Sequence, residues 1–206
     1  MAGSMILEVE KLTPRLFKMV TIIFEAHGTT TDNEKHLASG WNDVELSELG
    51  IRQSKEMGQR YADDYFDAIF CSDLQRAYKS AGIAFGDKFK IVKSPLLKEC
   101  DYGDLTQHLS EEVDKEKPNR INIQFPNGES YEQTSERMRV FLQKLLKEYD
   151  GKRIMIIGHR ATQYGLERWC NGIPVSISVQ LAPEWRWQPG WKYELTDKWF
   201  EIEKSV

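Results

Sequence analysis

Two histidines in this sequence follow apolar runs of the kind that form buried strands. His27 comes directly after Val20–Ala26, and His159 comes directly after Arg153–Gly158. The carboxyl ends of parallel strands meet at one edge of a sheet, where ligands bind in open α/β folds, so we expect both imidazoles to face one pocket. A lone histidine at a turn more often bonds to nearby backbone, but two at equivalent junctions favour a shared site.

Such a pair suits the hydrolysis of a phosphate ester. A neutral imidazole is a competent nucleophile near pH 7 and can leave again, so it can divide the reaction into two displacements. The negative charge on the transferred group needs fixed donors, which a protonated His159 and the backbone N–H groups that follow Gly28 would provide. This chemistry requires no metal and no cofactor.

An arginine and a glutamate complete the set of candidate catalytic residues. Arg76 lies in the first turn of a predicted helix, and its guanidinium fork matches phosphate oxygens. Glu99 follows the third strand pattern. Close to anionic groups its charged form is disfavoured, so it would keep a proton and donate it to the departing alkoxide. Taken alone, Arg76 would be a solvated helix residue and Glu99 an ordinary loop carboxylate.

Strand and helix patterns alternate along the chain. This order predicts an α/β fold with three layers, in which a mostly parallel sheet carries helices on both faces. The predicted strands are 20–26, 66–71, 89–92 and 153–158, and the predicted helices are 47–61, 74–85, a short one within 106–117, 130–149 and one that begins after His159. Two C-terminal segments, 175–179 and 193–202, are also predicted strands, the second as an antiparallel edge.

The composition is that of a globular protein with no broad charged surface. The chain has 206 residues, enough for one domain, and a net charge of -4, which gives no reason to expect nucleic acid or an acidic membrane as a partner. No apolar run approaches the roughly 20 residues of a membrane span. The three cysteines lack the spacing of a zinc site and favour a reducing cytoplasm. We expect residues 1–18 to be an N-terminal extension, partly an expression remnant, and residues 19–206 to form a single domain.

Six short motifs that include these candidate residues follow one another between Thr21 and Leu166. They are His27-Gly28-x-Thr30-x-x-Asn33, Gly40-x-x-Asp43-x-x-Leu46-Ser47-x-x-Gly50, Ser72-Asp73-Leu74-x-Arg76-Ala77-x-x-Ser80-Ala81, Leu97-x-Glu99-x-x-x-Gly103, Gly128-Glu129-Ser130 and Gly158-His159. In this order they resemble the histidine phosphatase superfamily, which has a phosphoglycerate mutase-like fold. An ordered series of this length is far more specific than any one of its pieces.

The resemblance implies a role for each candidate residue. These roles are nucleophile for His27, which becomes phosphohistidine, phosphoryl binding for Arg76 and His159, proton donation for Glu99, and lining of the phosphate pocket for Gly28, Thr30 and Asn33. The implied activity is that of a metal-independent phosphomonoesterase, similar to the histidine acid phosphatases, acting on a small phosphorylated metabolite. The oligomeric state is left open.

Two positions depart from the family pattern. The family motif begins Arg-His-Gly, whereas this chain has Ala26 before His27. A hydrogen bond to a charged group contributes about 1.5 to 3 kcal/mol, so the loss of this arginine would cost on the order of ten- to a hundredfold in phosphate binding or rate. Arg160 stands where the family usually has a small residue. Our hypothesis is that Arg160 partly replaces the missing guanidinium in binding phosphate; alternatively, it pairs with Glu25 or faces solvent.

Three functions are compatible with these motifs. Mutases of the family carry a long insertion between the acid and the Gly-Glu-Ser motif, and here the segment from Glu99 to Gly128 is short, which favours a phosphatase with water as the acceptor. A family member that binds a phosphorylated ligand with weak turnover or none is the alternative from a different class. The presence of both a nucleophile and an acid favours the enzyme.

Substrate choice is expected to depend on the variable segment 102–126 and on the C-terminal segment. Three tryptophans in the latter, Trp185, Trp187 and Trp191, either form an apolar wall for the substrate or pack the edge of the sheet. We favour packing, because tryptophan buries a large area wherever it occurs.

Overall fold

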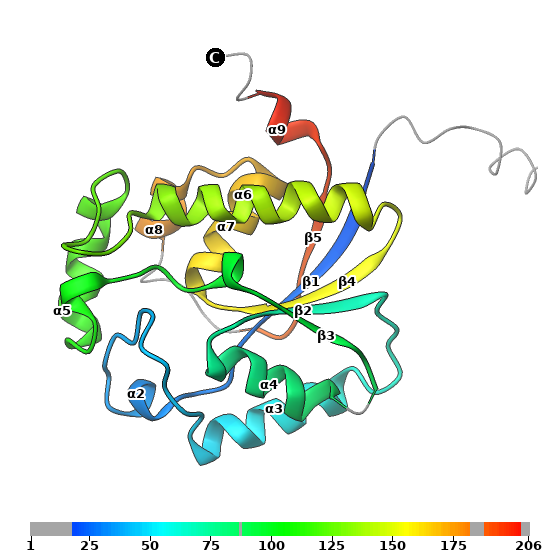
Figure 1. Cartoon of the computed structure of the whole chain (residues 1–206), viewed down its shortest axis with the longest axis horizontal. Coiled ribbons are helices and arrows are strands. Elements are labelled where there is room, and N and C mark those ends of the chain that lie inside the picture. Colours follow the sequence, from blue (N-terminus) through cyan, green and yellow to red (C-terminus); the bar gives the residue numbers. More distant parts are fainter. Residues whose placement is uncertain (1–17, 87, 182–187, 203–206) are drawn as a thin grey trace, which may run out of the picture.

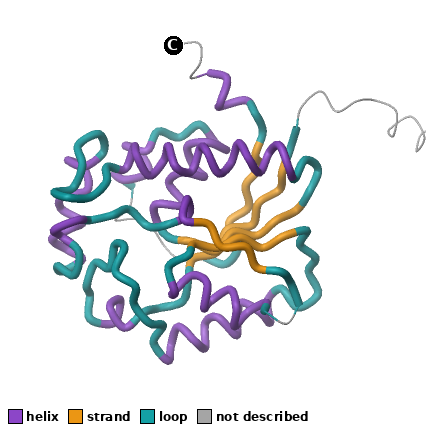
Figure 2. The backbone as a smooth tube through the Cα atoms, viewed as in Figure 1, coloured by secondary structure: helices purple, strands orange, loops and turns teal. Residues whose placement is uncertain are grey.

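A five-stranded sheet forms the centre of the computed structural model, which describes residues 18–86, 88–181 and 188–202 (Figures 1 and 2). The strands are β1 (Val20–Ala26), β2 (Ala68–Ser72), β3 (Ile91–Ser94), β4 (Arg153–Gly158) and β5 (Trp191–Leu195), in the order β3-β2-β4-β1-β5. Parallel pairing joins β1 to β4, β4 to β2 and β2 to β3, whereas β5 runs antiparallel to β1 at the edge. The predicted mostly parallel sheet is therefore confirmed.

Helices cover both faces of the sheet, which confirms the predicted three layers (Figure 1). They are α3 (Glu48–Arg60) and α4 (Gln75–Phe85) on one face, and α6 (Tyr131–Glu148) and α7 (Arg160–Asn171) on the other. Side chains of a strand alternate between the two faces. Ile23 of β1 accordingly belongs to the apolar cluster of α3 and α4, while Ile22 and Phe24 belong to the cluster of α6 and α7.

Local signals in the sequence explain where the main helices begin. The Ser47 hydroxyl accepts the N–H of Gly50 at 3.2 Å at the start of α3. At the start of α6, Ser130 and Gln133 form a reciprocal capping box. The face of α6 that is buried is the one predicted from its three-to-four spacing, with Met138, Phe141, Leu142, Leu145 and Leu146.

The two C-terminal strand predictions are wrong in whole or in part. Segment 175–179 forms helix α8 (Val175–Gln180), in which Val175, Ser178 and Val179 turn to one buried side. Apolar residues alternate with serines in this segment, as in a strand. A run this short is equally compatible with a helix, so the pattern could not decide between them. In segment 193–202 the predicted antiparallel edge is present as β5, but the strand ends at Leu195 and α9 (Lys198–Ile202) follows.

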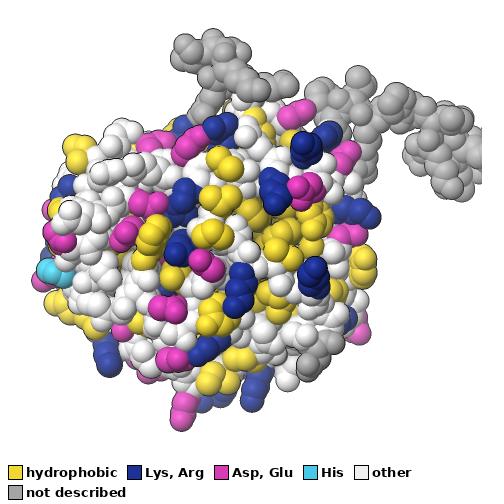
Figure 3. All heavy atoms as spheres, viewed as in Figure 1, with side chains coloured by type: hydrophobic (Ala, Val, Ile, Leu, Met, Phe, Trp, Pro, Cys, Tyr) yellow, Lys and Arg dark blue, Asp and Glu magenta, His cyan; other side chains and the backbone are white. Residues whose placement is uncertain are grey.

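Short elements and turns connect these layers, notably α2 (Thr31–Glu34) and α5 (Ser110–Glu116). Trp191 packs against Phe24 with ring centroids 5.7 Å apart, at the sheet edge. Trp185, Trp187 and the extension 1–17 lie outside the described residues. None of the helices in the described part of the chain combines the length and apolar character needed to cross a bilayer. On the face drawn in Figure 3, acidic and basic side chains are interspersed.

Candidate active site

The sheet brings His27 and His159 together at its carboxyl edge. Strands β1 and β4 pair in register up to Ala26 and Gly158, and the N–H of His27 donates to the Gly158 carbonyl at 3.1 Å. The imidazole ring centroids are 5.0 Å apart, with the ring planes inclined at 59°. Two histidines from distant parts of the sequence therefore share one site.

The backbone fixes the tautomer of His27. Its Nδ1 lies 2.7 Å from the carbonyl oxygen of Gly28, and because a carbonyl only accepts, Nδ1 carries the proton. The lone pair is then on Nε2. Burial, with a further contribution from the Arg76 charge, lowers the pKa of His27 to about 3. The ring is therefore neutral throughout the physiological pH range, with the lone pair of Nε2 available.

His159 is also neutral in this arrangement, although the sequence led us to expect a protonated ring. Burial lowers the pKa of His159 well below its usual range, and the charge of Arg76 acts in the same direction. The side chain is buried, and neither ring nitrogen has a hydrogen-bond partner among the described residues. An anion placed between the two rings would reverse this balance, because an opposite charge favours the protonated form.

Arg76 supplies a permanent positive charge near both rings. It lies in the first turn of α4 with its side chain buried, and its guanidinium donates to the carbonyls of Asn42 at 3.0 Å and Gly40 at 2.7 Å. Burial lowers the pKa of Arg76, and the Glu99 carboxylate opposes that effect. An arginine remains charged under all such conditions, so the site keeps one fixed cation.

Glu99 is held at the beginning of α7. Its Oε1 accepts the backbone N–H groups of Cys100 at 2.8 Å and Ala161 at 3.2 Å, and its Oε2 accepts the N–H of Arg160 at 3.1 Å. These donors include the first N–H groups of α7, which have no partner within the helix. The beginning of the helix thus fixes the carboxylate, and Glu99 lines the same cavity as His27 and His159.

The backbone donors that follow His27 are already engaged by side chains, which differs from the sequence-based expectation. The N–H of Gly28 donates to Ser80 Oγ at 2.9 Å, and that of Thr29 donates to Gln53 Oε1 at 2.8 Å. Gly28 is explained by packing instead, because a Cβ there would lie 2.5 Å from the carbonyl oxygen of Gly50. The N–H groups of Gly28 and Thr29 therefore already have hydrogen-bond partners within the protein.

Thr30 and Asn33 have different positions relative to the site. Thr30 is fully buried, and its hydroxyl accepts the N–H of Asn33 as the cap of α2. It is not among the described residues that line either of these two cavities, so its place in a phosphate pocket stays a prediction. Asn33 is exposed and lines both cavities, while its amide oxygen accepts the N–H of Thr30 at 3.0 Å.

Two cavities open around these residues. The larger has a volume of about 570 Å³ and includes His159 and Arg160, while the smaller, of about 130 Å³, includes Arg76. His27 and Glu99 line both, so these two residues lie where the cavities meet. Within the described ranges, no cluster of three His, Cys, Asp or Glu side chains has the arrangement of a metal site.

Lys117 is a second cation at the smaller cavity, and our sequence analysis missed it. Its side chain is 14% exposed and forms an ion pair with Asp114 at 2.6 Å. Burial alone would lower the pKa of Lys117, but the hydroxyl of Tyr164 and the carboxylate of Asp114 raise it, so the amine is charged. In the sequence, nothing in the charged run that contains Lys117 distinguishes it from its neighbours; only its low exposure in the folded chain does.

Comparison with known proteins identifies the family. A model of the histidine phosphatase superfamily (branch 1) matches residues 22–182, which is most of the chain. The chain belongs to this superfamily. It is 32% identical to the uncharacterized phosphatase PhoE of Bacillus subtilis over 149 residues, covering 72% of this chain and 76% of that protein. It is 31% identical to the phosphoglycerate mutase of Schizosaccharomyces pombe over 155 residues, covering 67% and 73%.

Solved structures of other superfamily members share the fold. A phosphoserine phosphatase variant from Entamoeba histolytica, in complex with phosphoserine, superposes with a TM-score of 0.70. The sequence identity is 23%, and the match covers 85% of this chain and 89% of that chain. The phosphoglycerate mutase-like fold suggested by the motifs is confirmed, and relatives of this superfamily member include both phosphatases and mutases.

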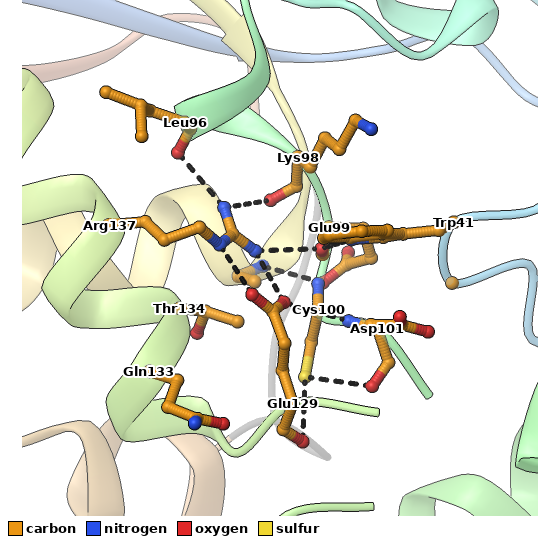
Figure 4. A network of polar contacts seen from close by, with 12 residues as sticks. Trp41, Leu96, Lys98, Glu99, Cys100, Asp101, Glu129, Gln133, Thr134 and Arg137 are labelled. Carbon is orange, nitrogen blue, oxygen red and sulfur yellow. Dashed lines mark hydrogen bonds and ion pairs between the residues drawn. The ribbon is translucent and has the colours of Figure 1, made fainter. Parts of the chain in front are cut away.

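The Gly-Glu-Ser motif of this superfamily member is connected to the backbone of Glu99 through Arg137 (Figure 4). Glu129 forms a bidentate ion pair with Arg137, whose NH2 also donates to the main-chain carbonyl of Glu99 at 3.1 Å. The indole N–H of Trp41 donates to the same carbonyl at 2.7 Å. Two donors thus fix the backbone at Glu99 while α7 fixes its carboxylate.

Ala26 and Arg160, the two positions that the motifs single out in the sequence, both line the larger cavity. Ala26 forms part of its wall. The Nε of Arg160 donates to the Tyr164 hydroxyl at 3.2 Å, and the Arg160 side chain lines this cavity. The carboxylate of Glu25 accepts hydrogen bonds from Arg60 at 3.2 Å and from Tyr61 at 2.7 Å. The sequence had suggested an ion pair between Glu25 and Arg160 as one alternative, and these two residues are its partners instead.

Proposed function

We propose that this superfamily member is a phosphomonoesterase that uses His27 as its nucleophile. The observation that carries the proposal is the hydrogen bond from Nδ1 of His27 to the Gly28 carbonyl, which leaves Nε2 unprotonated beside His159. A neutral, backbone-oriented imidazole with a low pKa needs no separate base to activate it. The cation Arg76 and the carboxylate Glu99 meet the other requirements of phosphoryl transfer within the same pocket.

The proposed reaction has two displacements. In the first, Nε2 of His27 forms a bond to phosphorus, the bond from phosphorus to the ester oxygen breaks, and Glu99 gives its proton to the departing alkoxide. In the second, a water molecule attacks the phosphohistidine, the bond from phosphorus to Nε2 breaks, and Glu99 takes a proton from the water. The proton that Glu99 takes from the water replaces the one it gave to the alkoxide, so the cycle ends where it began.

The developing charge on the phosphoryl oxygens is balanced by Arg76 and by His159, which gains a proton as the anion binds. This set lacks the cation that the family carries in place of Ala26. We therefore expect turnover on the order of ten- to a hundredfold below that of a member with the arginine. Arg160, which lines the same cavity as His27, is the candidate for partial compensation.

Water is the proposed phosphoryl acceptor, and the proposed substrate is a small phosphorylated metabolite. The short connection from Glu99 to Gly128 supports the phosphatase reaction over a mutase reaction. Relatives named as phosphatases, including a phosphoserine phosphatase of Hydrogenobacter thermophilus, are compatible with a substrate of this size. Mutases are also among the relatives, so the mutase reaction is the second candidate.

The test is the release of inorganic phosphate from p-nitrophenyl phosphate between pH 5 and 8. Wild type should hydrolyse the ester, and His27→Ala should not. His108→Ala is the matched control and should keep wild-type rates, because His108 is an exposed histidine that pairs with Glu112. A rapid acid-free quench should capture phosphate covalently bound to wild type alone. No phosphate release by wild type at any pH would replace the enzyme with a phosphate-binding module. Conversion of 3-phosphoglycerate to 2-phosphoglycerate would favour the mutase.

The role of Arg160 needs its own variants. Arg160→Ala should lower kcat/KM about tenfold, and Arg160→Lys should recover part of the loss because it restores the charge without the fork. An unchanged rate for Arg160→Ala would exclude compensation for the arginine missing at Ala26.

A further inference from the structure

A segment of three residues, 40–42, contacts two of the proposed catalytic residues at once. The main-chain carbonyls of Gly40 and Asn42 accept the guanidinium of Arg76 at 2.7 Å and 3.0 Å. The residue between them, Trp41, donates its indole N–H to the main-chain carbonyl of Glu99 at 2.7 Å. One short stretch of chain therefore connects the proposed phosphate-binding cation to the proposed acid.

The backbone of this segment is itself fixed on both sides of Trp41. Gly40 has a φ of 48°, and a Cβ there would lie 3.2 Å from the backbone nitrogen of Tyr102, so the close approach requires a glycine. On the other side, the Asp43 carboxylate accepts the N–H of Gln75 at 2.7 Å, at the first residue of α4. The segment therefore keeps a constant position relative to the helix that carries Arg76.

The Trp41 side chain contributes a directed hydrogen bond more than buried area. It is 37% exposed, whereas the core residue Trp169 is 2% exposed, so apolar burial explains less of its presence. The ammonium group of Lys98 lies 4.4 Å from the centre of its ring and 3.6 Å from the Asp73 carboxylate. These contacts orient the ring so that its N–H reaches Glu99.

Two donors reach the Glu99 carbonyl from different elements. Trp41 and Arg137 lie on opposite sides of Glu99 (Figure 4), and the guanidinium of Arg137 donates at 3.1 Å. A carbonyl oxygen has two lone pairs, and both are used here. The carboxylate at the other end of the residue accepts the N–H groups of Arg160 and Ala161. The carbonyl bonds therefore set where the Glu99 side chain begins, and the bonds to α7 set where it ends.

We propose, on the basis of the phosphomonoesterase function above, that Trp41 is a positioning residue for the acid Glu99. In the first displacement, the bond from phosphorus to the ester oxygen breaks as the proton of Glu99 moves to that oxygen. The phosphate on Arg76 and the acid must therefore be in place at the same moment, and segment 40–42 aligns them. A misplacement of 1 Å can cost on the order of a hundredfold in rate. Because Arg137 still holds the carbonyl when the indole N–H is removed, the expected loss is smaller, about tenfold.

Two esters with different leaving groups test this role. The p-nitrophenolate anion is a weak base and departs without a proton, whereas ethoxide is a strong base and needs one, so only ethyl phosphate depends on the acid. The quantity measured is kcat/KM, which reports the first displacement. Glu99→Gln sets the scale. It should lower kcat/KM about a hundredfold or more for ethyl phosphate and less than about tenfold for p-nitrophenyl phosphate.

Trp41→Phe removes the N–H donor and keeps an aromatic ring. It should lower kcat/KM about tenfold for ethyl phosphate and less than about twofold for p-nitrophenyl phosphate. The Ki of inorganic phosphate should not change, because the carbonyls that hold Arg76 belong to the backbone. Trp41→Leu removes the same donor, should show the same selective loss, and decides the role if Trp41→Phe does not fold in thermal unfolding.

The matched control is Trp199→Phe, with wild-type values for both esters. The Trp199 indole also donates to a main-chain carbonyl, that of Cys170 at 3.1 Å, and the ammonium group of Lys198 lies 4.5 Å from its ring centre. Trp199 is not among the described residues that line either cavity. The control thus loses the same kind of hydrogen bond at a place where no acid is positioned.

The outcomes separate this role from the general function. If Trp41→Phe lowers kcat/KM equally for both esters, changes neither, or raises the Ki of phosphate tenfold, the positioning role is refuted and the phosphatase stands. If Glu99→Gln lowers kcat/KM equally for both esters, Glu99 is not the acid and the role of Trp41 fails with it. If wild type hydrolyses neither ester, the phosphatase function itself fails.

Discussion

Glu129 and Arg137 form a bidentate ion pair, with Nε to Oε1 and NH2 to Oε2 at 2.8 Å each. The same guanidinium donates to the carbonyls of Leu96 and Glu99 at 3.1 Å (Figure 4). The pair thus connects the motif at the beginning of α6 to the backbone of the proposed acid. Both side chains are less than one-fifth exposed, at 17% and 18%, so the pair is shielded from water.

Breaking this pair should affect both stability and catalysis. In Arg137→Met the Glu129 carboxylate is left buried without its cation, and breaking a buried ion pair costs about 3 kcal/mol or more. We expect the free energy of unfolding in urea to fall by about that amount. We also expect kcat to fall more than KM rises, because Glu99 is displaced. Arg139→Met, which breaks the exposed pair with Glu136 on the same helix, is the control and should change neither quantity by much. Equal behaviour of the two variants would contradict this role.

Ser80 should be needed to hold the turn after the nucleophile. Its hydroxyl accepts the N–H of Gly28 and donates to the carbonyl of Arg76, and it is fully buried. Ser80→Ala leaves the Gly28 donor buried without a partner, which costs about 1–3 kcal/mol. Urea unfolding should show that loss, and kcat should fall because the Gly28 carbonyl also orients His27.

The control for this experiment is Ser54→Ala. Ser54 is equally buried, but its hydroxyl donates to a carbonyl within its own helix, so its removal leaves no N–H without a partner. It should lose less than half as much stability as Ser80→Ala. A kcat for Ser80→Ala equal to wild type would exclude the positioning role.

The sequence contained enough to predict the sheet and the main helices. The apolar run of β4 and the amphipathic pattern of α6 are long enough to have a clear period. The same argument fails for segment 175–179, which is too short to show a period, and its alternating apolar residues occur in α8. Tertiary packing determines the structure of such a segment more than its local pattern does.

The site was predictable only where it depends on the ends of strands. His27 and His159 are adjacent because parallel strands end at one edge, which a strand pattern reveals. The partners of the backbone after His27 are not predictable this way, because Ser80 lies 52 residues from Gly28 and Gln53 lies 24 residues from Thr29. Contacts over such distances depend on how the helices pack on the sheet.

Two neutral histidines, the buried His159 and the half-buried His27, should make the protein less stable in mild acid. Burial lowers the pKa of His27 to about 3 and that of His159 well below its usual range, whereas in the unfolded chain both titrate near 6.5. Between these values the unfolded state binds more protons than the folded state. The contribution is therefore full above about pH 6.5, and the free energy of unfolding falls as the pH falls, by up to about 1.4 kcal/mol per pH unit for each ring.

Urea unfolding between pH 7 and 4.5 measures this slope. His159→Gln removes one of the two groups and should reduce the slope by roughly one proton. His108→Gln, at an exposed histidine beside Glu112, should keep the wild-type slope. A wild-type slope in His159→Gln would mean that the ring is not held neutral by the fold.

Lys117 should contribute to substrate binding through its charge at the smaller cavity, which it lines together with Arg76 and His27. A charged hydrogen bond to the substrate contributes about 1.5 to 3 kcal/mol, so Lys117→Met should raise KM about tenfold or more while kcat changes little. Lys115→Met is the matched control, because Lys115 lies two residues earlier, in the last turn of α5, is 71% exposed and pairs with Glu111. Steady-state kinetics with p-nitrophenyl phosphate at two ionic strengths separates the two lysines. If both variants raise KM by a similar amount and salt abolishes the effect, the lysines act through long-range electrostatic attraction, and Lys117 makes no direct contact with the substrate.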